Sequence, residues 1–549
     1  MRRLVCFIAC FTLAATAAYP QAPTAKSPDA KAAAPVGNQE ARAARAYEAA
    51  VHAGPLALYA FLAEFPKGAD LHVHLSGAVY AESFIRAAAE DGLCVNTATL
   101  SFVKAPCVGD LAPAVQVPAN QDLYDRLINA FSMRSFVPTA GFSGHDQFFS
   151  TFARFGGLNK SHTGEWVDES ASRAAAQNQQ YLELMETPPF SHAAQVARQI
   201  GWGPGSAGRE FDTPDFVQIR QALLDHGLRD EVAADLDDVR SAEARRRQME
   251  HCDSPQAALA CKVEVRYIYQ ILRGFPPEQV FAQTLLGFET VQQSMASETR
   301  GRYEGAFVGI NFVQPEDGFI SMRDYRLHMK MVEYLHSVYP KVHIALHAGE
   351  LAPGLVPPEG LRFHIREALE RGHAERIGHG VDVMYEDDGP ALLAELARKH
   401  VMVEINLSSN EGILGIKGGD HPFPIYRAAH VPVALSTDDE GVSRIDITHE
   451  YVRAALDYHL TYQDLKQLAR TGMEHNFLPG DSLWAVQDGF AVSVARCKAQ
   501  PMGQEAPTGA CREFLDGSEK ATAQWELERR FRAFEVRIGA SQPGLHARK

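Results

Sequence analysis

Short apolar, β-branched runs alternate with amphipathic helical patterns through most of the chain. Eight of these runs predict strands, and helical patterns separate the later ones. Because strands that alternate with helices pair in parallel, the repeat favours an α/β fold, a (β/α)₈ TIM-like barrel. The predicted strands are 69–75, 181–186, 262–272, 306–313, 342–347, 376–379, 401–407 and 431–437, and the later helices are 322–338, 358–371, 390–399 and 423–429.

The spacing of these elements divides the chain into parts. The early strands are far apart, which predicts insertions at about 94–180 and 187–261, the second with a charged helical stretch at 215–250. Residues 41–65 predict an N-terminal helical extension, 66–496 the barrel with its inserted loops, and 497–549 a C-terminal helical segment.

The N-terminus is typical of a secretory signal peptide over residues 1–18. Two arginines precede an apolar run from Leu4 to Ala15, and small residues offer cleavage after Ala17 or Ala18. Residues 19–40 are rich in Ala, Pro, Lys and Gln, which predicts a flexible linker. We therefore expect an exported protein, periplasmic or secreted. No later segment has 18 consecutive apolar residues, so no membrane span is expected.

Removal of the signal would leave six cysteines in three close sequence pairs, Cys94 with Cys107, Cys252 with Cys261, and Cys497 with Cys511. Export permits disulfides. Six cysteines allow 15 connectivities, of which pairing between sequence neighbours is the simplest. Free buried thiols are the alternative. No CxxC motif is present, which disfavours zinc ribbons and thioredoxin-like redox chemistry.

Composition excludes other classes of protein. Hydrophobic residues make up 46% of the 549 residues, enough to bury a large core. The net charge of −15 disfavours nucleic-acid binding, which depends on neutralising phosphates.

Polar residues follow four of the predicted strands. They are His72 and His74 after the first, His347 after the fifth, His379 after the sixth, and Asp438 with Asp439 after the eighth. Alternate residues of a strand face the same side, so His72 and His74 can reach one ion. Barrel active sites lie at the carboxyl ends of the strands. A purely structural role would favour apolar residues there, because unpaired imidazoles and carboxylates are costly to bury.

These residue types indicate metal chemistry. Three neutral imidazoles and one carboxylate suit zinc and leave a position for water, whose pKa the metal lowers toward neutrality. Glu350 lies three residues past one ligand, close enough to act as a general acid. His379 can hold or deprotonate the attacking water, and Asp439 can hydrogen-bond to substrate.

Four segments together resemble the adenosine deaminase family: PKGADLHVHLSG at 66–77, HAGE at 347–350, RIGHG at 376–380 and STDD at 436–439. The resemblance covers roughly 61–75 and 181–483. It implies a zinc-dependent hydrolytic deaminase on a (β/α)₈ barrel. The signal, the helical extension and the segment 465–470 look more like the secreted, growth-factor-related branch, which implies a homodimer formed through the N-terminal extension.

The resemblance also implies roles for individual residues. One zinc ion per chain would be held by His72, His74, His347 and Asp438. Glu350 is implied as the proton donor to purine N1, and His379 as the residue that orients and activates the hydroxide attacking C6. Asp439 is implied as the acceptor for purine N7, while Gly349 belongs to the motif without a side-chain role. The HxE and PCxxC pattern of cytidine-type zinc sites is absent.

Two positions depart from the family pattern. Ser76 stands where an acidic residue near the ribose is common, so we expect greater tolerance of 5′-modified adenosines. Gln314, in the segment 313–317, stands near the place of a glycine whose backbone meets purine N3. Both departures concern the substrate and neither concerns the metal.

The sequence leaves three hypotheses about the function of the protein. The first is deamination of adenosine, with 2′-deoxyadenosine, to inosine and ammonia by a hydrolase acting on C–N bonds of cyclic amidines. The second is a deaminase of another purine, such as adenine, a nucleotide or a 5′-modified adenosine. No Arg and Lys cluster stands beside the motifs, which argues against nucleotides. The third is a secreted binding or signalling protein without turnover, which the complete set of polar groups disfavours.

Overall fold

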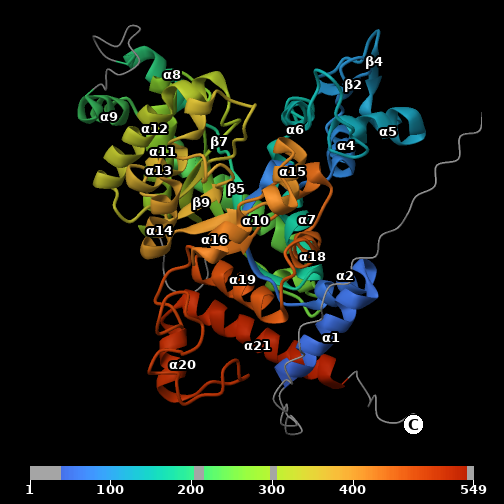
Figure 1. The fold of residues 1–549 in the computed structure, drawn as a ribbon. Helices are drawn as coiled ribbons and strands as arrows, with labels where there is room; N and C mark the ends of the chain where they lie inside the picture. The colour runs from blue at the N-terminus through green and yellow to red at the C-terminus, as the bar shows by residue number, and fades with distance from the viewer. Residues whose placement is uncertain (1–38, 203–214, 297–305, 541–549) are drawn as a thin grey trace, which may run out of the picture.

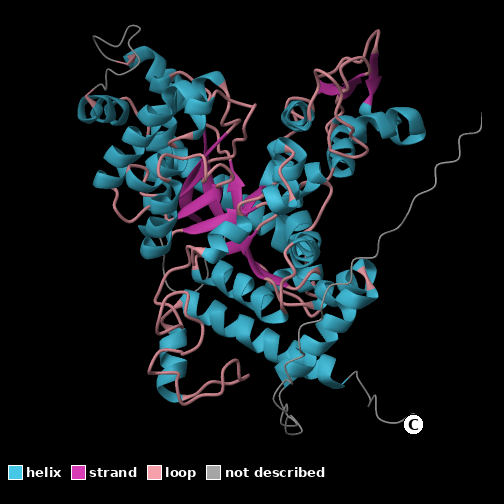
Figure 2. Ribbon diagram, in the orientation of Figure 1, coloured by secondary structure: helices cyan, strands magenta, loops and turns pink. Residues whose placement is uncertain are grey.

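A computed structural model describes residues 39–202, 215–296 and 306–540. The predicted signal peptide and nearly all of the predicted linker lie outside these residues. Eight strands form the centre of the molecule (Figures 1 and 2). They are β1 (Gly68–His74), β5 (Gln179–Glu186), β6 (Glu264–Leu272), β7 (Phe307–Val313), β8 (His343–Ala348), β9 (Arg376–His379), β10 (Met402–Ile405) and β11 (Val433–Leu435).

The eight strands pair in parallel and in chain order, from β1 to β11. The barrel closes just beyond β11, where Val73 forms a parallel bridge with Asp438. The Asp438 amide donates to the His72 carbonyl at 2.9 Å, and the His74 amide donates to the Asp438 carbonyl at 3.0 Å. The predicted (β/α)₈ barrel is confirmed, and its closing seam runs through predicted site residues.

Helices cover the outside of the barrel (Figure 2). They are α7 (Thr163–Ala176), α8 (Ser191–Ile200), α11 (Pro277–Ala296), α12 (Phe319–Val338), α13 (His364–Glu370), α14 (Gly389–Lys399), α15 (Leu407–Leu414), α16 (Phe423–Ala428), α17 (Glu440–Ser443), α18 (Ile447–Asp457) and α19 (Tyr462–Glu474). The central strands are buried along nearly their whole length, because barrel residues face either the interior or a covering helix.

The segment between β1 and α7 forms a separate lobe that projects from the barrel (Figure 1). It holds α3 (Leu75–Ala78), α4 (Ala81–Glu90), the antiparallel sheet of β2 (Cys94–Asn96), β3 (Ser101–Val103) and β4 (Leu111–Pro113), α5 (Gln121–Ala130) and α6 (Gly144–Phe152). Phe84, Phe131 and Phe155 lie in its own apolar core. Helix α6 returns from this lobe and packs against α15 near the barrel mouth.

The charged stretch predicted at 215–250 is two helices, α9 (Phe216–Asp225) and α10 (Asp230–Met249). Gly227 lies between them with a φ of +84°. A glycine adopts this left-handed conformation without the steric cost that other residues meet, so it ends the first helix.

The two ends of the described chain meet below the barrel (Figure 1). Helices α1 (Gln39–Ala53) and α2 (Pro55–Glu64) lie near α21 (Glu519–Ala540), which follows α20 (Gly509–Asp516). Lys466 of α19 pairs with Glu535 of α21 at 2.7 Å. Among the described residues, no helix combines the length and the apolar character that a membrane span needs.

Three disulfides join sequence neighbours: Cys94–Cys107, Cys252–Cys261 and Cys497–Cys511. The first fastens the small sheet of the projecting lobe, the second the turn after α10, and the third the segment before α20. None of the six cysteines lines the cavity at the barrel mouth.

Candidate active site

Four of the predicted site residues form a tight cluster at the carboxyl ends of the strands. Nε2 of His347 lies 3.1 Å from Nε2 of His72 and 3.2 Å from Nε2 of His74. Oδ1 of Asp438 lies 3.4 Å from Nε2 of His72 and 3.2 Å from Nε2 of His74. All four side chains are nearly inaccessible to solvent.

These separations fit a metal ion. In a tetrahedral site with metal–ligand bonds of about 2.0–2.1 Å, neighbouring donor atoms lie about 3.3–3.4 Å apart. The measured values of 3.1–3.4 Å agree with that spacing. Without an ion, three imidazole nitrogens and a carboxylate would be buried face to face, which is unfavourable for unpaired polar groups. The cluster therefore can hold one metal ion.

Each histidine is oriented by a hydrogen bond at its other ring nitrogen. Nδ1 of His72 lies 2.6 Å from Oε2 of Glu404, and Nδ1 of His347 lies 2.8 Å from Oδ1 of Asn311. Nδ1 of His74 contacts Oε1 of Gln270. These acceptors place the imidazole proton on Nδ1 and leave the Nε2 lone pair free toward the centre of the cluster, as hydrogen-bond partners of metal-binding histidines commonly do.

Glu404 is itself held by a buried ion pair. Arg376 donates from Nε to Oε1 of Glu404 at 2.6 Å, and its NH2 lies 2.6 Å from Oε2 of Glu183. All three side chains are fully buried. The guanidinium keeps Glu404 ionised despite burial, so the pKa of Glu404 stays below its usual value.

Glu350 lies beside the cluster, where its backbone is held by a second glutamate. Oε1 of Glu316 accepts from the Gly349 amide at 3.0 Å, and Oε2 accepts from the Glu350 amide at 2.9 Å. His364 donates to the same carboxylate from Nδ1. Gly349 has a φ of +77°, so a left-handed turn precedes Glu350.

The side chain of Glu350 is suited to donating a proton. Burial, followed by the nearby negative charges of Asp438 and Glu316, raises the pKa of Glu350 well above its usual value. Its Oε1 has no hydrogen-bond partner among the described residues. A protonated carboxyl with a free face is what a general acid requires.

His379 ends β9 beside the cluster, with its Nδ1 3.6 Å from Oε1 of Glu350. Its Nε2 lies 3.8 Å from Oδ2 of Asp438 and has no hydrogen-bond partner within the described chain. His379 and Asp438 have φ values of +69° and +61°. Left-handed backbone at two non-glycine residues is a strained conformation that is often found at functional sites.

Asp439 is buried directly behind Asp438, and its Oδ1 has no partner in the described part of the protein. Burial, and then the charge of Asp438, raises the pKa of Asp439 well above its usual value. Asp439 cannot act as the implied acceptor for purine N7, because N7 is itself an acceptor. Only the protonated carboxyl of Asp439 can donate a hydrogen bond to it.

A cavity of about 400 Å³ opens from this cluster to the barrel mouth. Its inner end carries His74, His347, Glu350, Asp438 and Asp439, and its outer part is lined by Ser76, Phe148, Phe149, Phe152, Ala153, Thr187, Gln270, Leu272, Val313, Gln314 and Pro315. The cavity thus has a polar floor and a largely apolar wall, and the three phenylalanines come from α6.

Gln314 takes a glycine-like backbone conformation in this wall. Its φ is +85°. Its side-chain Oε1 accepts from the Gly274 amide at 2.6 Å, and its carbonyl accepts from Arg273 Nε at 3.2 Å. These bonds hold the left-handed backbone at the position where the family resemblance implies a glycine.

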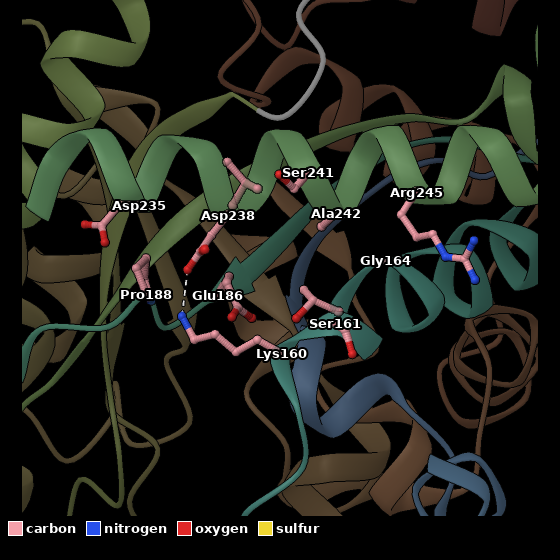
Figure 3. A pocket seen from close by; sticks show the side chains of 12 residues that line it. Lys160, Ser161, Gly164, Glu186, Pro188, Asp235, Asp238, Ser241, Ala242 and Arg245 are labelled. Carbon is pink, nitrogen blue, oxygen red and sulfur yellow. Dashed lines mark hydrogen bonds and ion pairs between the residues drawn. The ribbon is translucent and has the colours of Figure 1, made fainter. Parts of the chain in front are cut away.

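A second cavity, of about 240 Å³, lies outside the barrel between the start of α7 and α10 (Figure 3). Helix α10 contributes Asp235, Asp238 and Arg245 to its lining, and Glu186 and Lys160 lie across from that helix, where Lys160 pairs with Asp238 at 2.6 Å. Its lining holds three acidic and two basic side chains, and none of the metal-cluster residues lines it.

The sequence reading missed the groups that orient the site: Glu183, Gln270, Asn311, Glu316, Arg376, Glu404 and Asn410. Most of them are polar residues inside strands that are otherwise apolar, such as Asn311 in β7 and Glu404 in β10. These positions could have been predicted from the sequence, because a charged or polar residue in a fully buried strand needs a hydrogen-bond or ionic partner.

Comparison with known proteins finds similarity to adenosine deaminases. A family model described as adenosine deaminase matches residues 256–491. The adenosine deaminase of Salmonella schwarzengrund is 35% identical over 152 residues, which are 28% of this chain and 42% of that protein. The adenosine deaminase of Escherichia coli is 33% identical over 150 residues, 27% of this chain and 42% of that protein. The chain thus spans about two fifths of the length of these relatives.

Among solved structures, an amidohydrolase from Burkholderia ambifaria with bound zinc superposes with a TM-score of 0.50 and 17% sequence identity. The match covers 88% of this chain and 95% of the amidohydrolase. At this identity the likeness concerns the fold. The family model and the two bacterial relatives carry the comparison further: residues 256–491 of this chain match the adenosine deaminase family.

Proposed function

We propose that this protein deaminates adenosine and 2′-deoxyadenosine hydrolytically, with one zinc ion held by His72, His74, His347 and Asp438. The observation that carries the proposal is the cluster of four donor atoms 3.1–3.4 Å apart, with two buried carboxyls, Glu350 and Asp439, beside it. Zinc, when bound there, would act as a Lewis acid that makes water nucleophilic near neutral pH.

Three side chains of the protein supply the remaining chemistry. Glu350 donates its proton to purine N1, which makes C6 electrophilic. His379 orients the attacking oxygen, and Asp439 donates to N7 and fixes the purine plane. Water adds to C6 through its oxygen, and one of its protons restores the carboxyl of Glu350. The other proton passes to N6, the C6–N6 bond breaks, and the products are inosine and ammonia.

The cavity favours a nucleoside over a nucleotide. Its lining, all of it in the described part of the chain, includes three carboxyl groups and neither Lys nor Arg. A phosphate would therefore find no Lys or Arg side chain in the lining to pair with. Ser76, Thr187 and Gln314 are neutral groups that suit hydroxyls of a ribose.

The predicted signal peptide adds a proposal about location. We propose that the protein is exported, to the periplasm or beyond the cell, and that the N-terminal extension joins two copies.

Ammonia release by the purified full-length protein tests the function, with adenosine, 2′-deoxyadenosine, adenine and AMP as substrates and metal content measured in parallel. We expect release from the two nucleosides and about one zinc per chain. Glu350→Gln should keep zinc and lose about 10²–10⁴-fold in rate, since Glu350 is not a ligand. Glu359→Gln, at an exposed glutamate nine positions on, is the matched control. Preference for adenine or AMP, or turnover that persists in Glu350→Gln, would contradict the proposal.

A further inference from the structure

His379 is joined to the protein interior by a chain of three hydrogen bonds that begins at a backbone amide. The Phe423 amide donates to Nδ1 of His421 at 3.1 Å. Nε2 of His421 lies 3.1 Å from Oδ1 of Asn410, and Nδ2 of Asn410 lies 2.9 Å from Nδ1 of His379. His421, Asn410 and His379 are nearly or fully inaccessible to solvent.

The direction of each bond follows from the first one. A backbone N–H can only donate, so Nδ1 of His421 is an acceptor and carries no proton. Burial, and then the charge of Arg453, lowers the pKa of His421 to about 3, so its single proton is on Nε2. That N–H needs an acceptor, which Oδ1 of Asn410 provides.

The amide of Asn410 is therefore fixed in one of its two orientations. Its Nδ2 group, which can only donate, faces Nδ1 of His379. A second amide, Nδ2 of Asn406, lies 3.4 Å from the same ring nitrogen. The competing acceptor for a proton on Nδ1 would be Oε1 of Glu350, but it lies 3.6 Å away, too far for a hydrogen bond.

We propose that Asn410 and His421 are positioning residues that set the tautomer of His379, so that this imidazole presents an N–H at Nε2 to the reaction. The inference rests on the proposed function for its chemical meaning, and on the hydrogen-bond chain for the tautomer itself. It assigns His379 as a hydrogen-bond donor. A hydroxide nucleophile needs a donor beside it, whereas a water molecule that must lose a proton needs an acceptor.

The atom at the end of the chain is free to act. Nε2 of His379 has no hydrogen-bond partner within the described residues and points toward the ligand cluster, 3.8 Å from Oδ2 of Asp438. A fixed donor aimed at the position where charge develops lowers a barrier without needing to reorganise, and removing one such donor typically costs about 10²–10³-fold in kcat.

Nitrogen NMR of protein labelled at histidine Nδ1 tests the tautomer directly, in the metal-free and the metal-loaded chain, with the His379 signal identified by its loss in His379→Gln. We expect an unprotonated Nδ1 in the wild type. Asn410→Asp replaces the donor with an acceptor of the same shape, so Nδ1 should become protonated. A protonated Nδ1 in the wild type would overturn the proposal, whatever the enzymatic activity.

Kinetics of the same variants test the chemical role. Asn410→Asp should lower kcat by about 10²–10³-fold with little change in KM, because the tautomer is reversed while the metal stays bound. If His379 acts as a base instead, the added carboxylate should maintain or raise kcat, and that result would refute the donor assignment.

Variants of His421 separate tautomer control from structural support and remain informative if Asn410→Asp fails to fold. Gln at position 421 can donate to Oδ1 of Asn410 as Nε2 does, so His421→Gln should keep most of kcat, while His421→Leu should lose it. Equal losses of kcat in both variants would contradict the proposed control of the His379 tautomer by the hydrogen-bond chain. The control is His328→Leu, another fully buried histidine, on α12, whose ring nitrogens have no hydrogen-bond partner in the described part of the chain. It should leave kcat and the His379 signal unchanged.

Inosine and ammonia formation by the wild type decides the proposed function separately. An inactive protein with an unprotonated Nδ1 on His379 would refute the function and leave the tautomer assignment intact.

Discussion

Gly77→Ala tests whether the carboxyl of Asp439 takes part in the reaction. A Cβ added at Gly77 in α3 would lie 1.5 Å from Oδ1, 2.3 Å from Cγ and 2.7 Å from Cβ of Asp439. Nonbonded heavy atoms rest at about 3.5–4.0 Å. The Asp439 side chain therefore has to move by roughly 2 Å, since the methyl group added by the substitution is fixed to the backbone.

The expected cost follows from that displacement. Asp439 moved by this distance can no longer donate to purine N7, and the bound purine loses a buried hydrogen bond. A buried group left without its partner costs about 1–3 kcal/mol, which corresponds to roughly 5–150-fold in kcat/KM. The metal ligands are untouched, so zinc content should stay at the wild-type level.

The assay is kcat/KM for adenosine, with zinc content and thermal unfolding measured on the same samples. Gly472→Ala in α19 is the matched control, because a Cβ there would lie 3.6–3.8 Å from its neighbours, an ordinary contact. It should keep full activity and gain slightly in stability, since alanine favours a helix by up to about 1 kcal/mol.

Combining Gly77→Ala with Asp439→Ala separates the cause from a general disturbance. If the added methyl acts only by moving the carboxyl, the double variant should be no less active than Asp439→Ala alone. Wild-type kcat/KM in Gly77→Ala with zinc in place would refute the reasoning, as would additive losses in the double variant.

Three further predictions concern stability and specificity. Burial raises the pKa of Asp235, which lines the second cavity between α7 and α10, from 3.8 to about 8. Between about pH 4 and pH 8 the carboxyl of Asp235 therefore keeps its proton in the folded state and loses it in the unfolded chain. The free energy of unfolding falls across this range as the pH rises. Asp235→Asn should leave the free energy of unfolding near its wild-type value at pH 4 and raise it by at least about 1 kcal/mol at pH 8. An equal change at both pH values would contradict this expectation. Replacing Cys252 and Cys261 with serine opens a loop with a sequence separation of 9 and should cost roughly 3 kcal/mol of stability while the initial rate persists, and a matching loss of rate would show that the loop supports the site. Ser76→Asp should raise the ratio of kcat/KM for adenosine over 5′-deoxyadenosine by about 5–30-fold if a bond of about 1–2 kcal/mol to the 5′-hydroxyl is gained, and an unchanged ratio would show that Ser76 lies elsewhere.

The sequence predicted the barrel strands closely because buried parallel strands are continuous apolar runs. The predicted strand 376–379 matches β9, and 181–186 lies within β5. The last two predicted strands, 401–407 and 431–437, are longer than β10 and β11. Their polar ends leave the strand conformation to serve the site, and Asp438, one residue past 431–437, has a left-handed backbone.

Long-range contacts were beyond the sequence pattern. The periodicity of α6 identifies an apolar face but gives no reason for Phe148, Phe149 and Phe152 to line the active-site cavity. That placement depends on how the projecting lobe folds back over the barrel. The same holds for Glu316, whose partners at 349, 350 and 364 are 33 to 48 positions away in sequence.

The closing seam of the barrel and the candidate metal site share the same residues, so a bound ion would couple folding to metal binding. The backbone of Asp438 bonds to His72 and His74 across the seam, while the side chains of these three residues point to one cluster. A shift of one residue in strand register would turn both histidines to the other face of β1. An ion that binds only the closed seam stabilises it by mass action, by about 2.7 kcal/mol when its free concentration is 100 times its Kd. Barrel closure therefore brings the proposed ligands together, and an ion bound there would in turn favour the closed barrel.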